Sequence, residues 1–447
     1  MGELAISNQS ETIASESVQR ALEVAVGAGA DAAEAAASFE TGLSVTARQR
    51  EVESLEFQND RGFSITVYKD QRKGSASTSD LSPDAIAAAV SKAMYIASQT
   101  EADEYAGLAD PSRMASSFPD LELDHAWGIT ADAASEMAVQ IEAAALGVDD
   151  RIKNSEGASV ATQRGLSVYG NTHGFLGTQR RSAHSRSCAV VAQDAQGMER
   201  DYHYTAARNP SRLVDGVEVG REAGRRAVNR LSPVKIETRD APILFRADRA
   251  GGLIGHLLGA IAGGAQYRKA SYLLGAVGQQ VMASSITIAE RPHLLEGMGS
   301  TAFDGEGVAT ADRDIVRDGV LQGYVLSSYS ARRLGLESTA NAGGVHNATV
   351  SGGGGDFEAM LQKLDTGLLV TELMGQGVNI VTGDYSRGAA GYWVEGGEIR
   401  YPVSEVTIAG NLSDMFQQIA TVGDDRDERG RVHCGSVLIE SMKIAGN

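Results

Sequence analysis

Four groups of residues in this chain could carry chemistry, and none of them completes a common catalytic motif. His256 lies in a glycine-rich segment, residues 250–264, and His433 precedes Cys434 in a strand-like context. A thiol needs a neighbouring base to become a nucleophile, but adjacent strand residues face opposite sides, so His433 cannot readily activate Cys434. His256 and Cys434 are therefore weak catalytic candidates. A hydrogen-bonded core histidine and a buried, inert cysteine are the more frequent roles of such residues.

The other two groups lie in glycine-rich segments. His346 falls within Asn341–Gly355, which we expect to be a flexible loop with a solvated histidine. Gly383–Gly388 (GDYSRG) places several polar groups between glycines, and it could contact a peptide backbone or form only a turn. The sequence has no P-loop, no GxGxxG after a strand, no G-x-S-x-G, no CxxC and no HExxH.

The segment around His256 has a regular glycine spacing. Glycines recur every fourth residue, at Gly251, Gly255, Gly259 and Gly263. At 3.6 residues per turn, this spacing places them along one face of a helix. Each glycine costs a helix about 1 kcal/mol relative to alanine, so four of them suggest close approach of another backbone. The apolar run Leu257–Ala262 is far too short to span a bilayer, so we expect a buried helix.

The composition limits the classes of function. The 447 residues include 40 basic and 58 acidic side chains, a formal net charge of −18, which argues against nucleic-acid binding. The two cysteines, Cys188 and Cys434, lie far apart, and the N-terminus has no signal-like pattern. These features predict a cytoplasmic protein without disulfides and without a membrane partner.

Helical and strand-like periodicities follow one another in an α+β order. Helices are predicted at residues 11–27, 82–98, 131–146, 217–230, 357–363 and 412–419. Strands are predicted at 43–47, 63–68, 166–169, 175–178, 189–192, 202–205 and 241–245, with a turn at Asn59–Gly62. Two-residue turns at Asp318-Gly319 and Gly396-Gly397 predict hairpins of 313–317 with 320–326 and of 392–395 with 398–402.

This order predicts antiparallel sheets flanked by helices, since no βαβ alternation is present. We expect a boundary near Leu231–Pro233. It would separate an N-terminal α+β domain, 1–232, from a C-terminal domain, 233–447, of largely antiparallel sheet with the buried glycine-rich helix. The first domain could itself comprise subdomains of about 1–120 and 121–232.

Most of the second half, Ala241–Gly446, resembles the TldD/PmbA family of zinc peptidases, on its PmbA (TldE) side. The resemblance rests on the segments GHLLGAIAGGAQYRKASYLL, FDGEGVATADRDIVRDGVLQGYVLSSYSARRLGLEST, TELMGQGVNIVTGDYSRGAAGYWVEGGEIRYPVSEVTIAGN and HCGSVLIESMKIAG. The TldD branch has an HExxxH helix whose two histidines, with a distant cysteine, are understood to bind zinc. On this chain the first histidine falls at Gly255, the glutamate at His256 and the second histidine at Ala260. The cysteine matches Cys434.

The resemblance therefore implies that this chain has lost its metal and has no other cofactor. Catalytic zinc needs about three protein ligands and an open position for water, which Cys434 alone cannot supply. His256 stands one residue along from the first ligand position, rotated by about 100° around the helix. The implied function is that of a zinc-free partner in a cytoplasmic heteromeric peptidase, in which a TldD-type chain supplies the zinc.

Such an enzyme would degrade or trim unfolded peptides, for example by removing leader peptides from modified peptide antibiotics. The family's description as a modulator of DNA gyrase would then be indirect. Two other functions stay open: an independently active peptidase that uses a metal or a thiol at His256 and Cys434, and a non-catalytic peptide-binding or chaperone-like module. A homodimer is plausible when the chain is isolated.

Overall fold

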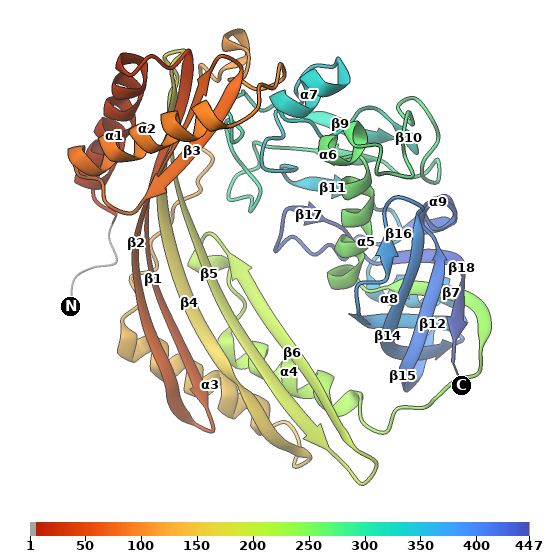
Figure 1. Cartoon of the computed structure of the whole chain (residues 1–447). Helices are drawn as coiled ribbons and strands as arrows, with labels where there is room; N and C mark the ends of the chain where they lie inside the picture. The colour runs from red at the N-terminus through yellow and green to blue at the C-terminus, as the bar shows by residue number, and fades with distance from the viewer. Residues whose placement is uncertain (1–5, 447) are drawn as a thin grey trace.

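The computed structural model describes residues 6–446, and the N-terminal half is built on one large sheet (Figure 1). Its strands are β1 (Ala32–Arg48), β2 (Glu51–Lys69), β3 (Arg72–Thr78), β4 (Ile152–Asn171), β5 (Leu176–Gln193) and β6 (Met198–Ala207). Its helices are α1 (Asn8–Gly27), α2 (Pro83–Gln99), α3 (Ala131–Leu146) and α4 (Gly216–Asn229). The strands pair antiparallel in the order β3-β2-β1-β4-β5-β6. Because β1 pairs with β4, strands from both expected subdomains share this sheet.

Four helices cover one face of this sheet. Alternate residues of β1 are buried in its first part, from Ala33 to Ala37, and again in its second part, from Leu43 to Ala47. The first part of this face packs against α1 and α2, and the second part packs against α3 and α4. Side chains of a strand alternate between faces, so the opposite face is left for other contacts. On β6, Tyr202 and Tyr204 occupy that opposite face, because His203 between them pairs with the helix-facing Cys188.

The turn predicted at Asn59–Gly62 is wrong. β1 and β2 form one long hairpin, and their turn lies at Gln49-Arg50, both with positive φ (53° and 66°). The amides of these two residues donate hydrogen bonds of 2.8 and 2.6 Å to the buried carboxylate of Glu142 in α3. A tertiary contact thus fixes the turn, and Asn59–Gly62 stays in the ladder with β1.

The C-terminal half contains two further sheets, whose strands are mostly shorter. Its strands are β7 (Arg239–Phe245), β8 (Ile288–Glu290), β9 (Arg313–Arg317), β10 (Val320–Leu321), β11 (Ala348–Val350), β12 (Gly367–Met374), β13 (Val378–Asn379), β14 (Asp384–Glu395), β15 (Glu398–Asn411), β16 (Ile419–Val422), β17 (Val432–His433) and β18 (Val437–Ala445). Its helices are α5 (Ala247–Ala260), α6 (Gly263–Tyr267), α7 (Ser328–Leu334), α8 (Phe357–Leu364) and α9 (Leu412–Gln417).

One of these sheets closes on itself. The order β12-β7-β18-β15-β14 returns to β12, which pairs with β14, while β13 and β16 are added at the sides. The other sheet has the order β10-β9-β8-β11-β17. The apolar side of α5 belongs to the main core of this half, which includes residues from both sheets. The helix lies between the two sheets (Figure 1). The position of α5 therefore depends on both sheets.

Most of the predicted elements are present, and the α+β class with antiparallel sheets is confirmed. The helices match within a few residues, and the turns at Asp318-Gly319 and Gly396-Gly397 connect hairpins, although β10 ends at Leu321. The flexible loop predicted at Asn341–Gly355 is wrong in part. It contains β11, which is paired on both sides, and Asn347 and His346 are buried. The division at residue 232 stays a proposal.

None of the helices between residues 6 and 446 combines the length and the hydropathy that a membrane crossing requires.

Candidate functional site: a degenerate helix beside a cleft between the two halves

The helix that carries His256 is α5, and its two sides differ. Its apolar side is buried, while Gly252 and Gly255 are exposed and Gly259 is half-buried. A Cβ atom at Gly255 or Gly259 would meet no neighbouring atom within 4 Å. The close packing predicted for the glycine stripe is therefore wrong at these positions. Only Gly263 is packed tightly, against Ser330, and it lies in α6, because α5 ends at Ala260.

The three motif positions on α5 have different environments. Gly255 is exposed and has no donor atom, whereas Ala260 is fully buried in the core. His256 is half-buried, with its ring edge against Tyr385 at 6.0 Å between ring centres. Burial lowers the pKa of His256, and the positive charge of Arg387 lowers this pKa further. His256 is therefore neutral near pH 7.

Cys434 is sealed in the core rather than presented to a substrate. Its side chain is fully buried, and its thiol donates to the carbonyl oxygen of Gly435 at 3.3 Å. Burial, with the nearby negative charge of Asp425, raises the pKa of the Cys434 thiol to about 12. The Nε2 atom of His433 lies 3.1 Å from the Gly430 carbonyl oxygen, so this ring is occupied elsewhere. The structure does not prepare a thiolate at this position.

These residues do not fit a catalytic zinc. Gly255 and Ala260 offer no ligand atom, and among residues 6–446 neither His256 nor Cys434 belongs to a group of three converging metal-ligand side chains. One such group does occur there, formed by Glu122, His125 and Glu296. It has other partners already, because Glu296 accepts hydrogen bonds from Asn209 and Arg212. His346 is also engaged, through Nε2 with the carbonyl oxygen of Ala340 at 2.9 Å, and burial lowers its pKa.

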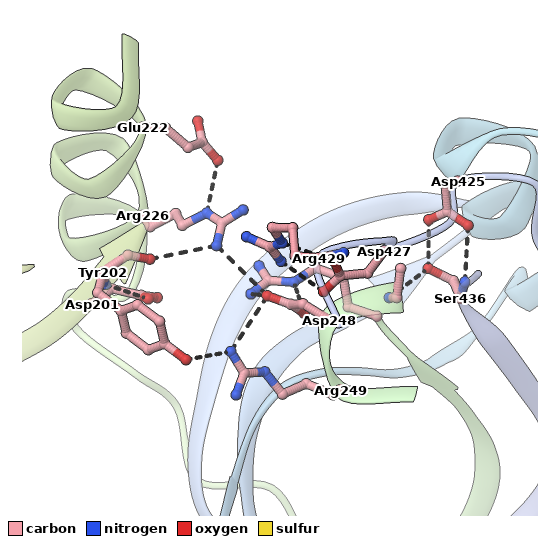
Figure 2. A network of polar contacts seen from close by, with 12 residues as sticks. Asp201, Tyr202, Glu222, Arg226, Asp248, Arg249, Asp425, Asp427, Arg429 and Ser436 are labelled. Carbon is pink, nitrogen blue, oxygen red and sulfur yellow. Dashed lines mark hydrogen bonds and ion pairs between the residues drawn. The ribbon is translucent and has the colours of Figure 1, made fainter. Parts of the chain in front are cut away.

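The start of α5 instead carries a network of charged side chains (Figure 2). Asp248, in the first turn, accepts two hydrogen bonds of 2.8 Å from Arg246. Arg249 of α5 and Arg226 of α4 approach the same carboxylate at 3.4 and 3.7 Å. Burial alone would raise the pKa of Asp248, but the hydrogen bond and charge of Arg246, with the other two arginines, lower it to about 2. This carboxylate is therefore ionised and joins the two halves of the chain.

The face of β6 that points away from the helices extends the same network, through the half-buried Tyr202 and Tyr204. Arg249 donates a 2.8 Å hydrogen bond to the hydroxyl of Tyr202. The guanidinium of Arg429 lies 4.0 Å from the ring centre of Tyr204 and donates to the Tyr204 carbonyl oxygen at 2.8 Å. Arg429 is itself paired through two hydrogen bonds with Asp427. Cation–π contacts and charge-assisted hydrogen bonds together fix α5 and the 425–431 segment against the N-terminal sheet.

A cleft of about 830 Å³ lies between the two halves, beside the start of α5. Its walls are residues 203–208 of β6 and the chain after it, 246–248, 294–298 and 425–429. The lining carries charges of both signs, among them Arg212, Arg426 and Glu428. Burial lowers the pKa of His203, on the cleft wall, to about 4, and its buried Nδ1 has no hydrogen-bond partner in the described chain. The cleft is large enough for a short stretch of extended peptide.

The residues that organise this region were not among those predicted from the sequence. Arg246, Asp248 and Arg249 stand immediately before the glycine stripe, as R-A-D-R. Two arginines around one aspartate at a predicted strand-to-helix junction are a usable signal for a charged first turn. Their partners on β6 and α4 could not be read from the sequence, because those contacts join elements that are far apart in the chain.

Models of one protein family match most of the chain. The PmbA/TldA metallopeptidase domain 1 matches residues 33–97, the central domain matches 124–231, and the C-terminal domain matches 238–446.

Named relatives agree with these matches. The chain is 52% identical to Metalloprotease PmbA of Escherichia coli O157:H7 over 434 residues, which cover 97% of this chain and 96% of that protein. It is 50% identical to a PmbA homologue of Haemophilus influenzae over 433 residues, with the same coverage. It is 27% identical to a TldD homologue of Haemophilus influenzae over 228 residues, 47% of each chain.

Solved structures share the fold along nearly the whole chain. A crystal structure from Bacteroides thetaiotaomicron, described as a modulator of DNA gyrase, has a TM-score of 0.93 and 26% identity, and the match covers 99% of this chain and 100% of that one. TldE from Thermococcus kodakarensis has a TM-score of 0.84 at 22% identity, over 96% of this chain and 100% of that one, and supports the fold alone.

Proposed function

The chain belongs to the PmbA/TldD family of metallopeptidases, and from this premise we propose that it is the zinc-free subunit of a heteromeric peptidase. One observation carries the proposal: the positions that match the family's zinc ligands offer no converging donors. Gly255 is exposed without a side chain, Ala260 is fully buried, and Cys434 is sealed in the core with a raised thiol pKa. Water activation by zinc would therefore occur in a partner chain.

The partner in this proposal is a TldD-type chain. A TldD homologue is similar to about half of this chain, which supports two related subunits with different site residues. The partner would supply the HExxxH helix, and this chain would supply one wall of the chamber that admits the peptide. The assembly would act in the cytoplasm on unfolded peptides, including leader peptides.

An exposed edge of the large sheet is the surface that we assign to this partner. Within the described chain, residues 51–62 of β2 pair only with β1, because β3 pairs with β2 only from Phe63 to Lys69. Val52, Leu55 and Phe57 are exposed on this stretch by 44%, 44% and 55%. An exposed strand edge with large apolar side chains favours pairing with another chain.

The cleft between the two halves supports a peptide as the substrate. Its walls come from both halves and carry arginines and acidic residues, so it offers donors and acceptors to a peptide main chain. A nucleic acid would require a mainly basic surface, which this lining does not provide.

The test combines metal analysis with peptide cleavage. Purified chain, a TldD-type paralogue and their mixture are each analysed for zinc by mass spectrometry and assayed on an unfolded peptide. We expect zinc to remain with the paralogue and cleavage to need both chains. If this chain alone binds stoichiometric zinc and the Cys434→Ala variant does not, the proposal is contradicted and an independent metal peptidase is favoured. If the mixture cleaves no faster than the paralogue alone, a peptide-binding module is favoured.

A further inference from the structure

Beside the exposed glycines of α5, polar side chains from two elements come together. His256 belongs to α5, and Tyr385 and Arg387 belong to β14. Tyr385 and Arg387 are two residues apart in a strand, so their side chains leave the sheet on the same face. The His256 ring meets the Tyr385 ring edge-on at 72°, and its pKa is lowered by the nearby charge of Arg387.

Some polar groups of this cluster have no hydrogen-bond or ion-pair partner. Tyr385 is 2% exposed, and its hydroxyl has no hydrogen bond of normal geometry in the described chain. Burial raises the pKa of this hydroxyl to about 12, and the nearby guanidinium of Arg387 acts in the opposite direction. The buried Nε of Arg387 has no acceptor either, and between residues 6 and 446 no carboxylate lies within ion-pair distance of this guanidinium. An unpaired buried hydroxyl and an unpaired half-buried cation both cost stability, and a bound anion would remove that cost.

The adjacent surface of α5 is open to a ligand. Gly252 and Gly255 are exposed, and no atom lies within 4 Å of where a Cβ would stand on Gly252, Gly255 or Gly259. Without side chains on this face, another main chain can approach the helix closely. Side chains on this face of α5 therefore do not block the approach of a peptide to His256.

We propose that His256, Tyr385 and Arg387 form a subsite for one carboxylate of a peptide lying along the glycine face of α5. The Arg387 guanidinium suits a carboxylate, to which it can donate two parallel hydrogen bonds. The Tyr385 hydroxyl donates a further hydrogen bond, and neutral His256 can donate or accept one from the peptide main chain. This inference deepens the proposed function and rests on it for a peptide as the ligand.

The test measures binding to the full chain alone, so it does not depend on cleavage. The probe is a fluorescein-labelled, unstructured decapeptide of Gly, Ser and Ala with one internal Asp. Matched peptides carry a C-terminal amide, an Asn in place of the Asp, or both changes. The variants are Arg387→Met and Tyr385→Phe, and the control is Arg317→Met, an exposed arginine on β9 in the other sheet.

We expect Arg387→Met to weaken binding of the acidic probe at least tenfold, and Tyr385→Phe to weaken it about threefold to tenfold. Arg317→Met should bind like the unmodified chain. The peptide that lacks the bound carboxylate should bind the unmodified chain at least tenfold more weakly than the acidic probe does. The Arg387→Met variant should bind these two peptides equally well. Loss with the amide identifies the C-terminal carboxylate, and loss with Asn identifies the side chain.

Equal binding of all four peptides to the unmodified chain would overturn the subsite, as would no difference between Arg387→Met and Arg317→Met. Thermal unfolding of each variant separates a folding defect from a binding defect, and Tyr385→Phe tests the site with the smallest change in shape. If the subsite binds as expected but the mixture with a TldD-type chain shows no added cleavage, the proposed function fails and the carboxylate site stands. If instead the mixture shows added cleavage but the acidic probe does not bind as expected, the subsite is wrong and the proposed function stands.

Discussion

The carboxylate of Asp425 accepts two hydrogen bonds from Ser436, one from the amide at 2.8 Å and one from the hydroxyl at 2.6 Å (Figure 2). The same hydroxyl oxygen accepts a hydrogen bond of 3.1 Å from the amide of Ala247, the first residue of α5. Ser436 is fully buried. It therefore ties the start of α5 to the segment that carries Cys434, and it fixes the two parts of the degenerate motif relative to each other.

Ser436→Ala should destabilise the chain by about 1–3 kcal/mol, because it leaves a buried amide and a carboxylate oxygen without partners. Thermal unfolding followed by circular dichroism measures the effect. Ser441→Ala, at an exposed position of β18, is the matched control and should change stability by less than about 0.5 kcal/mol. Equal midpoints for the two variants would contradict the role assigned to Ser436.

Gly255→Ala and Gly263→Ala should have opposite effects on stability. Gly255 lies in a helix with free space around it, so alanine should stabilise the chain by about 0.5–1 kcal/mol. A Cβ on Gly263 would collide with Ser330 and Leu326, and overpacking of this kind costs about 1–3 kcal/mol. Unfolding midpoints of the two variants check this pair of predictions. A loss of stability in Gly255→Ala would instead support the close packing that the glycine spacing first suggested.

The ion pairs of Asp248 should make stability fall at low pH. Its pKa is about 2 in the folded chain, below the ordinary value of 3.8, so this contribution is complete above pH 3.8 and is lost as the pH falls toward 2. A shift of this size corresponds to roughly 2 kcal/mol. Asp248→Asn should lower the unfolding midpoint at pH 6. The difference in midpoint between this variant and the unmodified chain should shrink as the pH approaches 2.

The exposed Asp60→Asn on β2 serves as the control for this pH series. A deficit for Asp248→Asn that stays constant from pH 6 to pH 2 would show that the network does not hold its carboxylate in the ionised form.

Neither cysteine should react quickly in the folded chain. Burial raises the pKa of both Cys188 and Cys434 to about 12, so at pH 8 only about one thiol in 10⁴ is ionised. Titration with a chromogenic disulfide reagent should detect both thiols in denaturant and neither within minutes under native conditions. One fast-reacting thiol that disappears in Cys434→Ser would instead favour a thiol peptidase.

Phe57→Lys should weaken association with a TldD-type chain at least tenfold, because it places a charge on the apolar edge assigned to the partner. Tyr95→Lys, at a position of α2 that is 67% exposed, controls for the general effect of replacing an exposed aromatic residue. Sedimentation velocity of the mixed chains measures the complex. If the two variants associate equally well with the partner, the interface lies elsewhere.

Local sequence signals were enough to predict most secondary-structure elements and the missing zinc ligands. Helical periodicity placed most helices, and the pairs Asp318-Gly319 and Gly396-Gly397 placed two hairpins, because such signals act within a few residues. The identities of Gly255 and Ala260 already excluded two ligand atoms at the motif positions, since neither residue has one to offer.

Three features depend on long-range packing and could not be predicted from local sequence: which side of α5 faces solvent, where the β1–β2 turn lies, and which groups meet His256. The turn at Gln49-Arg50 depends on Glu142, 92 positions away from Arg50. The glycine spacing predicted tight packing, but the surroundings of the helix in the folded chain leave Gly255 on an open surface. The meeting of His256 with Tyr385 and Arg387 joins segments about 130 residues apart. Such contacts follow from how sheets and helices pack, which local propensity does not encode.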